Sequence, residues 1–288
     1  MQVKPWDFMV KDTPSRDWAE GKGAFIVFAF FCGGIAGGLY LTSLYFNNLW
    51  GMFLGWLFAL SMGIFDIAHL GNKAIVWRIM MRPNSSWISR GFLLVLLFIG
   101  SAAVQMALNY WYPGTGLETV FKVISGIAAF GVVTYSGFVL SYVSGIKFWN
   151  STIMPVLFII SGFAGGSAIL LVISCFAGTD QFGPIRLATI SFLTAYTAII
   201  GLHLWISTYN SATARNSVKQ IVAGSLAGIF WPVVVFVGLV IPSILIAVAQ
   251  SGSHVTVIIN AVCILASNLA LRYTILKAGM YGPLLPAR

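Results

Sequence analysis

Eight apolar stretches of about 20 residues or more follow one another along this chain, with only short polar connections between them. A helix needs about 20 mainly apolar residues to cross a hydrocarbon core about 30 Å thick. Within lipid the backbone must satisfy its own hydrogen bonds, which favours helices. We therefore expect an all-α integral membrane protein of the lipid bilayer, with eight transmembrane helices at residues 23–46, 50–69, 91–110, 119–143, 153–176, 185–207, 221–249 and 254–276.

The composition excludes several classes of protein. Hydrophobic residues fill 59% of the 288 positions and charged residues only 8%, whereas a soluble protein has about 25% charged residues. The spans leave no room for a soluble domain, and the sequence has no P-loop, His-Glu-x-x-His or Cys-x-x-Cys motif. These absences argue against a self-contained hydrolase or phosphoryl-transfer enzyme, so large catalytic machinery is expected in a partner.

The net charge of +9 predicts orientation in the membrane, not a nucleic-acid partner. Fourteen of the sixteen Lys and Arg residues lie in the N-terminal arm, in the connections 70–90, 144–152 and 208–220, or near the C-terminus. With eight spans, all these segments share one side of the membrane. By the positive-inside rule that side is cytoplasmic. We expect a multi-pass protein of the cytoplasmic membrane with both termini inside.

The two halves of the sequence echo each other. The first span contains Gly34-Ile-Ala-Gly37-Gly38, and the fifth contains Gly162-Phe-Ala-Gly165-Gly166. Small residues at such positions are typical of helices that pack closely in lipid. An even number of spans per unit predicts parallel repeats. The expected organisation is a polar arm (1–22), a first four-helix bundle (23–143), a loop (144–152), a second four-helix bundle (153–276) and a tail (277–288).

The segment from 69 to 91 concentrates ionisable groups at the membrane edge. Asp66 precedes His69 by three residues, so the two side chains share one face of a helix. An imidazole can take up and release a proton near neutral pH, and a neighbouring carboxylate could orient it. Gly71 then leaves room for a ligand or a partner. The alternative interpretation is a structural pair at a helix end.

Arginines dominate the rest of this segment. Arg78 and Arg82 are one helical turn apart, and Arg90 begins the third span. They could polarise a polar head group, bind lipid phosphates or dock a soluble partner. Arg272, near the end of the last span, is expected to extend its side chain to the membrane surface. Trp149 is expected in an aromatic belt at the interface.

Two other functions compete with a ligand site in the first bundle. His69 and His203 both lie near the same side of the membrane, and two imidazoles can bind one haem iron. A b-type haem subunit is therefore an alternative. A multi-pass transporter is another, although the polar residues inside the spans, such as Gln105 and Asn268, are uncharged amides.

Four segments carry a resemblance to a known family. They are FFCGGIAGGLYL (30–41), HLG (69–71), RPNSSWISRG (82–91) and KFWNSTIMPVLFIISGFAGG (147–166). With these segments in this order, the sequence resembles the NrfD/polysulfide reductase membrane-subunit family. The family includes the anchor subunits of dimethyl sulfoxide, polysulfide, thiosulfate and tetrathionate reductases.

The resemblance implies an eight-helix, haem-free subunit that binds a quinone, expected to be menaquinone, in the first bundle. Such a subunit is not catalytic alone. It would exchange electrons with a four-cluster ferredoxin-like iron-sulfur subunit docked over the 70–90 loop, which works beside a molybdopterin catalytic subunit. No metal site is expected in this chain. The family's histidine before Leu-Gly carries over onto His69, as the proton-transfer residue, and its Ile-Ser-Arg-Gly segment onto Ser89 and Arg90. By position we add Asp66 as the deeper partner of His69, and Gly71, Arg82, Tyr135 and Tyr142 as further pocket positions.

The resemblance and the charge distribution differ on orientation. In periplasmic respiratory members of the family, the iron-sulfur partner docks outside, on the side of the N-terminus and the His-Leu-Gly segment. Charge counting places that side of this protein in the cytoplasm. Either the complex faces inward, or docking arginines distort the charge rule.

Overall fold

The structure is a computed structural model that describes residues 7–178, 180–248 and 253–284. Within these ranges, eight helical segments are long and apolar enough to cross a membrane, which confirms the predicted all-α membrane fold. They run over Gly21–Tyr45, Leu49–His69, Trp87–Trp111, Gly116–Ser141, Ile153–Ala177, Phe182–Asn210, Ala227–Ile246 and His254–Ala278.

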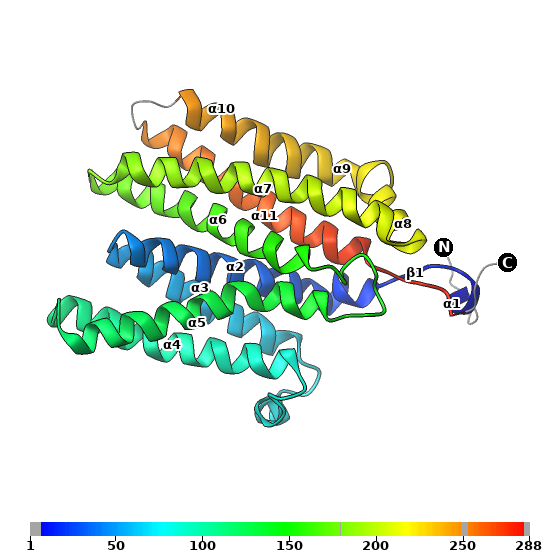
Figure 1. Cartoon of the computed structure of the whole chain (residues 1–288), viewed down its shortest axis with the longest axis horizontal. Helices are drawn as coiled ribbons and strands as arrows, with labels where there is room; N and C mark the ends of the chain where they lie inside the picture. The colour runs from blue at the N-terminus through cyan, green and yellow to red at the C-terminus, as the bar shows by residue number, and fades with distance from the viewer. Residues whose placement is uncertain (1–6, 179, 249–252, 285–288) are drawn as a thin grey trace.

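The first four spans contact one another in a ring and form one layer of the molecule (Figure 1). Helix α2 packs against α3 and α5, and α4 packs against α3 and α5. The helices are α2 (Ala24–Tyr45), α3 (Leu49–His69), α4 (Trp87–Trp111) and α5 (Gly116–Ser141). Between α3 and α4, the predicted 70–90 loop contains a nine-residue 3₁₀ helix, η3 (Lys73–Met81).

The last four spans form a second layer beside the first. Helix α6 (Ile153–Ala177) packs against α7 (Phe182–Asn210) and α11 (His254–Ala278), and α11 packs against the seventh span. Helices α2 and α5 meet α6 across the boundary between the layers. The sequence duplication itself stays a prediction.

The seventh span differs from its predicted range of 221–249, whose last residue lies outside the described part of the protein. Residues Ala212–Val222 form a separate helix, α8, because Ser211 caps its start by accepting a hydrogen bond from the Ala214 amide. A new start follows at α9 (Ala227–Ile229), which leads into a π-helical stretch, η4 (Phe230–Val240), and then α10 (Ile241–Val248). Pro232 and Pro242 lie in this span, and proline removes a backbone donor from a regular helix.

The echoed glycine motifs face each other at the boundary between α2 and α6. A Cβ added to Gly38 would overlap the backbone of Gly162, and one added to Gly166 would overlap the backbone of Leu39. A Cβ on Gly162 would lie 2.6 Å from the carbonyl oxygen of Gly34. The predicted close approach of helices at these glycines is confirmed, and it occurs between the two motifs themselves.

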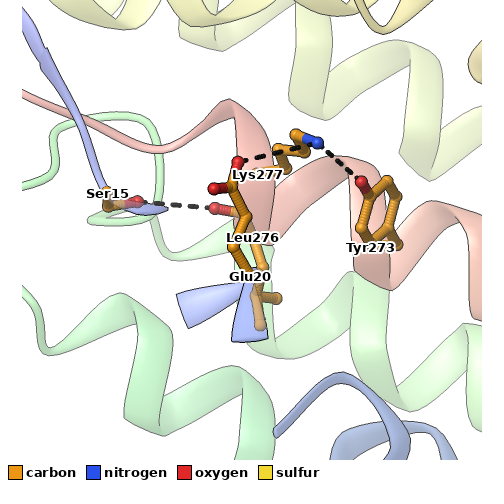
Figure 2. Close-up of polar contacts among 5 residues, drawn as sticks. All are labelled: Ser15, Glu20, Tyr273, Leu276 and Lys277. Atoms are coloured by element: carbon orange, nitrogen blue, oxygen red, sulfur yellow. Dashed lines mark hydrogen bonds and ion pairs between the residues drawn. The ribbon is translucent and has the colours of Figure 1, made fainter. Parts of the chain in front are cut away.

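The N-terminal segment and the end of α11 are fastened together at one end of the molecule. Strand β1 (Thr13–Pro14) pairs with β2 (Met280–Tyr281), and the Ser15 hydroxyl lies 3.0 Å from the Gly279 carbonyl oxygen and 3.4 Å from that of Leu276. The Lys277 ammonium lies 3.7 Å from a carboxylate oxygen of Glu20 and donates to the Tyr273 hydroxyl at 2.7 Å (Figure 2). Residues 1–6 of the predicted arm and 285–288 of the predicted tail lie outside the described residues.

This fastened segment continues over the end of the first bundle. After helix α1 (Asp7–Val10) and strand β1, it forms two short 3₁₀ helices, η1 (Arg16–Trp18) and η2 (Gly21–Gly23), before α2 begins. Trp18 packs edge-on against Trp149, with the ring centroids 5.1 Å apart. Trp149 is fully buried and donates its indole N–H to the Ile275 carbonyl oxygen at 2.9 Å. The expectation that Trp149 belongs to an interfacial belt is therefore wrong.

Candidate functional site

A cavity of about 430 Å³ lies at the end of the first bundle, beneath the N-terminal segment. All four helices of the bundle contribute to its wall, together with η1 and η3. The lining is mainly apolar, with a few polar groups. The lining residues are Asp17, Trp18, Ile26, Phe30, Asp66, Ile67, His69, Leu70, Val76, Ile79, Ile88, Phe92, Tyr135 and Val139.

His69 is the last residue of α3, and its ring is oriented by the backbone of η2. Nδ1 lies 3.0 Å from the carbonyl oxygen of Lys22. A carbonyl oxygen can only accept, so Nδ1 carries the proton in this bond. Nε2 is then the acceptor nitrogen of the neutral ring, and it becomes a donor when the ring is charged. The geometry leaves Nε2 as the atom that can exchange a proton with a ligand.

Asp66 and Tyr135 also line the cavity, from α3 and α5. Among the described residues, neither the Asp66 carboxylate nor the Tyr135 hydroxyl has a hydrogen-bond partner in the protein. Asp66 and His69 share a face of α3, as the three-residue spacing predicts, but no hydrogen bond joins them. The expectation that Asp66 orients the imidazole therefore differs from the structure, in which the Lys22 carbonyl does so.

Arg90 and Ser89, at the start of the third span, lie outside the cavity lining. Arg90 donates from Nε to the Pro83 carbonyl oxygen at 2.7 Å and from Nη2 to that of Asn84 at 2.8 Å. Its guanidinium also lies over the Trp87 ring, 4.7 Å from the centroid. Ser89 is buried in the first turn of α4, where its amide donates to the Ser86 hydroxyl. Arg90 thus holds the turn before α4 in shape and does not line the cavity.

Three other predicted positions lie outside the lining as well. Gly71 is exposed, and a Cβ added to it would meet no atom within 4 Å, so the predicted open space is there. Arg82 is exposed after η3. Tyr142, at the end of α5, is 69% exposed. Of the eight predicted site residues, the structure brings His69, Asp66 and Tyr135 together around the cavity.

Gly91 connects the third-span motif to the cavity. A Cβ at Gly91 would overlap the ring of Tyr135, lying 2.5 Å from its Cζ. The missing side chain therefore leaves the space that the Tyr135 ring occupies. Gly91 follows directly after Arg90, and its position at the end of the RPNSSWISRG segment was the available sequence signal.

Sequence reasoning missed the contribution of the N-terminal segment. Asp17 and Trp18 of η1 line the cavity at the end nearest the N-terminal segment, which we call its polar end. The Lys22 carbonyl of the same segment accepts the hydrogen bond from His69. Every residue has a backbone carbonyl, so the sequence cannot indicate that the carbonyl of Lys22 binds His69. Asp17 could have been found as one of only seven acidic residues in the sequence.

The cavity is bordered by residues on the lipid-facing surface. Ile67 on α3 and Ile88 on α4 line it while exposing 40% and 53% of their surface. Both side chains are apolar and lie beside η3, where α3 and α4 are joined. Part of the cavity lining is therefore apolar and exposed at the surface of the bundle.

The two histidines considered for haem lie in different surroundings. His69 lines the cavity, whereas His203 is buried in α7 with its ring centroid 5.0 Å from that of Phe148. His203 is not part of the cavity wall. Among the described residues, no cluster of three or more His, Cys, Asp and Glu residues could hold a metal ion.

Comparison with known proteins identifies the family of this chain. The family model described as "Polysulphide reductase, NrfD" matches residues 23–282. The sequence is 32% identical over 167 residues to the C subunit of polysulfide reductase from Wolinella succinogenes; the match spans 55% of this protein and 53% of that one, about half its length. It is 25% identical over 252 residues to protein NrfD of Escherichia coli K12, with 74% of this protein and 76% of that one matched. The chain belongs to the NrfD/polysulphide reductase family of integral membrane proteins.

Proposed function

We propose that this protein is the quinone-binding membrane subunit of a multi-subunit oxidoreductase, and that it exchanges electrons between menaquinone and an iron-sulfur subunit. One observation carries the proposal. His69, Asp66 and Tyr135 line one apolar cavity, and among the described residues no hydrogen bond to the protein is found for Nε2 of His69, the Asp66 carboxylate or the Tyr135 hydroxyl. Such a cavity, with a few converging polar groups, is typical of a ligand site.

The cavity fits a quinone in size and in chemistry. A quinone head group is a flat apolar ring with two carbonyl oxygens, and its isoprenoid tail belongs in lipid. A volume of about 430 Å³ accommodates the ring. Phe30 and Phe92 supply apolar wall, and the lateral border at Ile67 and Ile88 lets the tail remain in the bilayer. When bound, a quinone accepts two electrons and two protons, and a quinol releases them.

The side chains at the polar end would handle the protons. Nε2 of His69 accepts a proton from a quinol hydroxyl, or donates one to a quinone oxygen when the ring is charged, while Nδ1 stays on the Lys22 carbonyl. Asp66 lies about one turn deeper on the same face. Asp17 lies on the extramembrane segment and gives the proton a route to water.

The surface next to the cavity suits a soluble redox partner. The 3₁₀ helix η3 carries Lys73 and Arg78 and exposes Trp77 and Met81, and Arg82 follows it. Arginine, tryptophan and methionine are enriched where proteins bind one another. A four-cluster ferredoxin-like iron-sulfur subunit docked here would lie directly above the cavity. A molybdopterin catalytic subunit would bind that partner, and the terminal substrate would belong to it.

The test uses the purified complex and the His69→Ala variant. The wild-type complex should contain extractable quinone and oxidise or reduce a soluble quinone analogue. His69→Ala should assemble normally but lose about 10²-fold or more of quinone-dependent turnover. His254→Ala is the matched control, because His254 begins α11 at the opposite end of the molecule. Normal turnover in His69→Ala, or quinone absent from the wild-type complex, would sink the proposal.

The charge distribution supports one orientation of the protein in the membrane. We propose that the end of the molecule with β1, β2 and η3 faces the cytoplasm, since the basic connections gather there. A membrane-impermeant thiol reagent applied to intact cells tests this on a cysteine introduced at Arg82. Labelling of Arg82→Cys only after cell lysis supports a cytoplasmic site, and labelling of intact cells contradicts it.

A further inference from the structure

Arg272 lies inside the protein, contrary to its expected extension to the membrane surface. It is on α11, and only 1% of its surface is exposed. Burying a guanidinium in a low-dielectric interior is unfavourable unless hydrogen bonds compensate for the lost hydration. An apolar side chain would fill the same space at lower cost. Arg272 therefore makes contacts that an apolar residue could not.

Those contacts join three helices. Arg272 donates from Nε to the Phe30 carbonyl oxygen of α2 at 3.1 Å and from Nη2 to the Ser161 hydroxyl of α6 at 3.1 Å. From Nη1 it donates to the Asn268 side-chain oxygen at 2.7 Å, within its own helix. Gly34 leaves space for the guanidinium, because a Cβ there would overlap Nη2. The group is thus seated in a site shaped by α2, α6 and α11.

Phe30 connects this buried site to the cavity. The carbonyl of Phe30 accepts the Arg272 bond, and its ring lines the cavity wall. The same ring packs edge-on against Tyr135 on the cavity side, with centroids 6.4 Å apart, and against Phe158 of α6 at 6.2 Å. Arg272 covers the Phe158 ring at 5.1 Å. Arg272 therefore holds both the backbone of Phe30 and one of the rings that Phe30 packs against.

A second set of contacts from the same helix holds the other wall. One turn further along α11, Leu276 and Lys277 bind Ser15 and Glu20 of the N-terminal segment (Figure 2). That segment supplies Asp17 and Trp18 to the cavity. Two walls of a cavity in the first bundle are thus attached to one helix of the second.

We propose that Arg272 is a positioning residue for the cavity in the first bundle, and that it acts through Phe30. The inference rests on the proposed quinone site and assigns the second bundle a role in it. Arg272 does not touch the ligand. It fixes where the aromatic wall stands, so its loss changes how tightly the head group is held more than how fast protons move.

The test compares Arg272→Gln with Arg272→Lys in the assembled complex. Arg272→Gln should raise the KM for a soluble quinol analogue about tenfold while changing kcat by less than about twofold. Arg272→Lys keeps a positive charge and donors, so it should recover part of the affinity. Asn260→Ala is the control on α11, since Asn260 is buried but lies outside the cavity wall; it should leave KM unchanged.

A double-mutant cycle separates positioning from general stability. If Arg272 acts through Phe30, the effects of Arg272→Gln and Phe30→Leu on KM should be strongly non-additive. If Arg272→Gln does not assemble, Ser161→Ala replaces it in the cycle; it removes one acceptor and should raise KM about threefold. Unchanged KM in the assembled variants, or additive effects, overturns the inference while leaving the proposed function intact. A wild-type complex that binds no quinol defeats the proposed function instead.

Discussion

Nδ1 of His69 donates to the carbonyl oxygen of Lys22 across 3.0 Å, and this bond links the last residue of α3 to the segment that precedes α2. The partner is a neutral backbone group, so the imidazole is held in place without a fixed counter-charge. The ring can therefore gain or lose a proton at Nε2 while its position is maintained.

Replacing His69 by asparagine separates two roles of this side chain, its hydrogen bond to the Lys22 carbonyl and proton transfer. In His69→Asn, the side-chain amide can still donate to the Lys22 carbonyl, but no titratable atom remains. We expect thermal stability close to wild type and quinol turnover lowered by about 10²-fold or more. Stability is measured by thermal unfolding in detergent and turnover with a soluble quinol analogue. Retained turnover in His69→Asn would show that another group transfers the proton.

Asp66→Asn tests the second proton group. Because the Asp66 carboxylate has no hydrogen-bond partner among the described residues, replacing it removes an ionisable group beside an apolar cavity and breaks no hydrogen bond among those residues. The thermal midpoint should be unchanged or higher, while turnover falls by about 10²-fold. Asp17→Asn, at the polar rim, should have a smaller effect. A large loss of stability in Asp66→Asn would contradict this assignment.

Gly91→Ala should disturb the cavity through Tyr135. The added methyl group overlaps the Tyr135 ring, and overpacking of this kind costs about 1–3 kcal/mol. We expect weaker binding of a quinone analogue, measured by titration of the purified complex. Gly100→Ala is the matched control on the same helix, because its Cβ would meet nothing within 4 Å. Equal binding by the two variants would falsify the proposed contact.

Gly38→Ala should weaken the boundary between the two layers. Its Cβ would overlap the backbone of Gly162, which has far less freedom to move aside than a flexible side chain. The expected cost is about 3 kcal/mol, the upper part of the range for overpacking. Gly201→Ala on α7 meets no atom within 4 Å and should be neutral. Unfolding in increasing concentrations of a denaturing detergent compares the two variants.

The contacts of the N-terminal segment differ in strength. The Ser15 hydroxyl is buried against the Gly279 and Leu276 carbonyls, so Ser15→Ala should cost about 1 kcal/mol. Glu20 and Lys277 form an exposed pair at 3.7 Å, with 48% and 36% of their side-chain surfaces accessible. Glu20→Gln should therefore cost well under 1 kcal/mol. Thermal unfolding at low and high salt should reveal salt dependence in the wild type that Glu20→Gln lacks.

Much of the fold follows from the apolar pattern, because lipid penalises any span that is too short or too polar. The segment at 212–222 shows the limit of that reasoning. Its apolar residues near 221 merge with the next span in the sequence, yet Ser211 starts a separate helix there. Local capping, not hydropathy, decides where the seventh span begins.

The site was predictable where it depends on spacing within one helix. Asp66 and His69 are three residues apart, and both line the cavity. The remaining contacts join residues that are far apart in sequence: Arg272 binds a carbonyl 242 positions away, and Trp149 one 126 positions away. Their side chains turn inward because backbone carbonyls inside the protein accept their hydrogen bonds, and no local pattern records which carbonyls those are.

The backbone contact between α2 and α6 has a consequence for how the protein is made. Helix α2 ends at Tyr45, and α6 begins at Ile153. During synthesis from the N-terminus, the glycine face of α2 therefore has no α6 to pack against until α6 has been made. The Phe30 carbonyl can accept the hydrogen bond from Arg272 only after α11, the last helix, has been made. A polypeptide that stops before α11 therefore lacks Arg272 and the Leu276 and Gly279 carbonyls, the groups that bind the Phe30 backbone and the Ser15 hydroxyl.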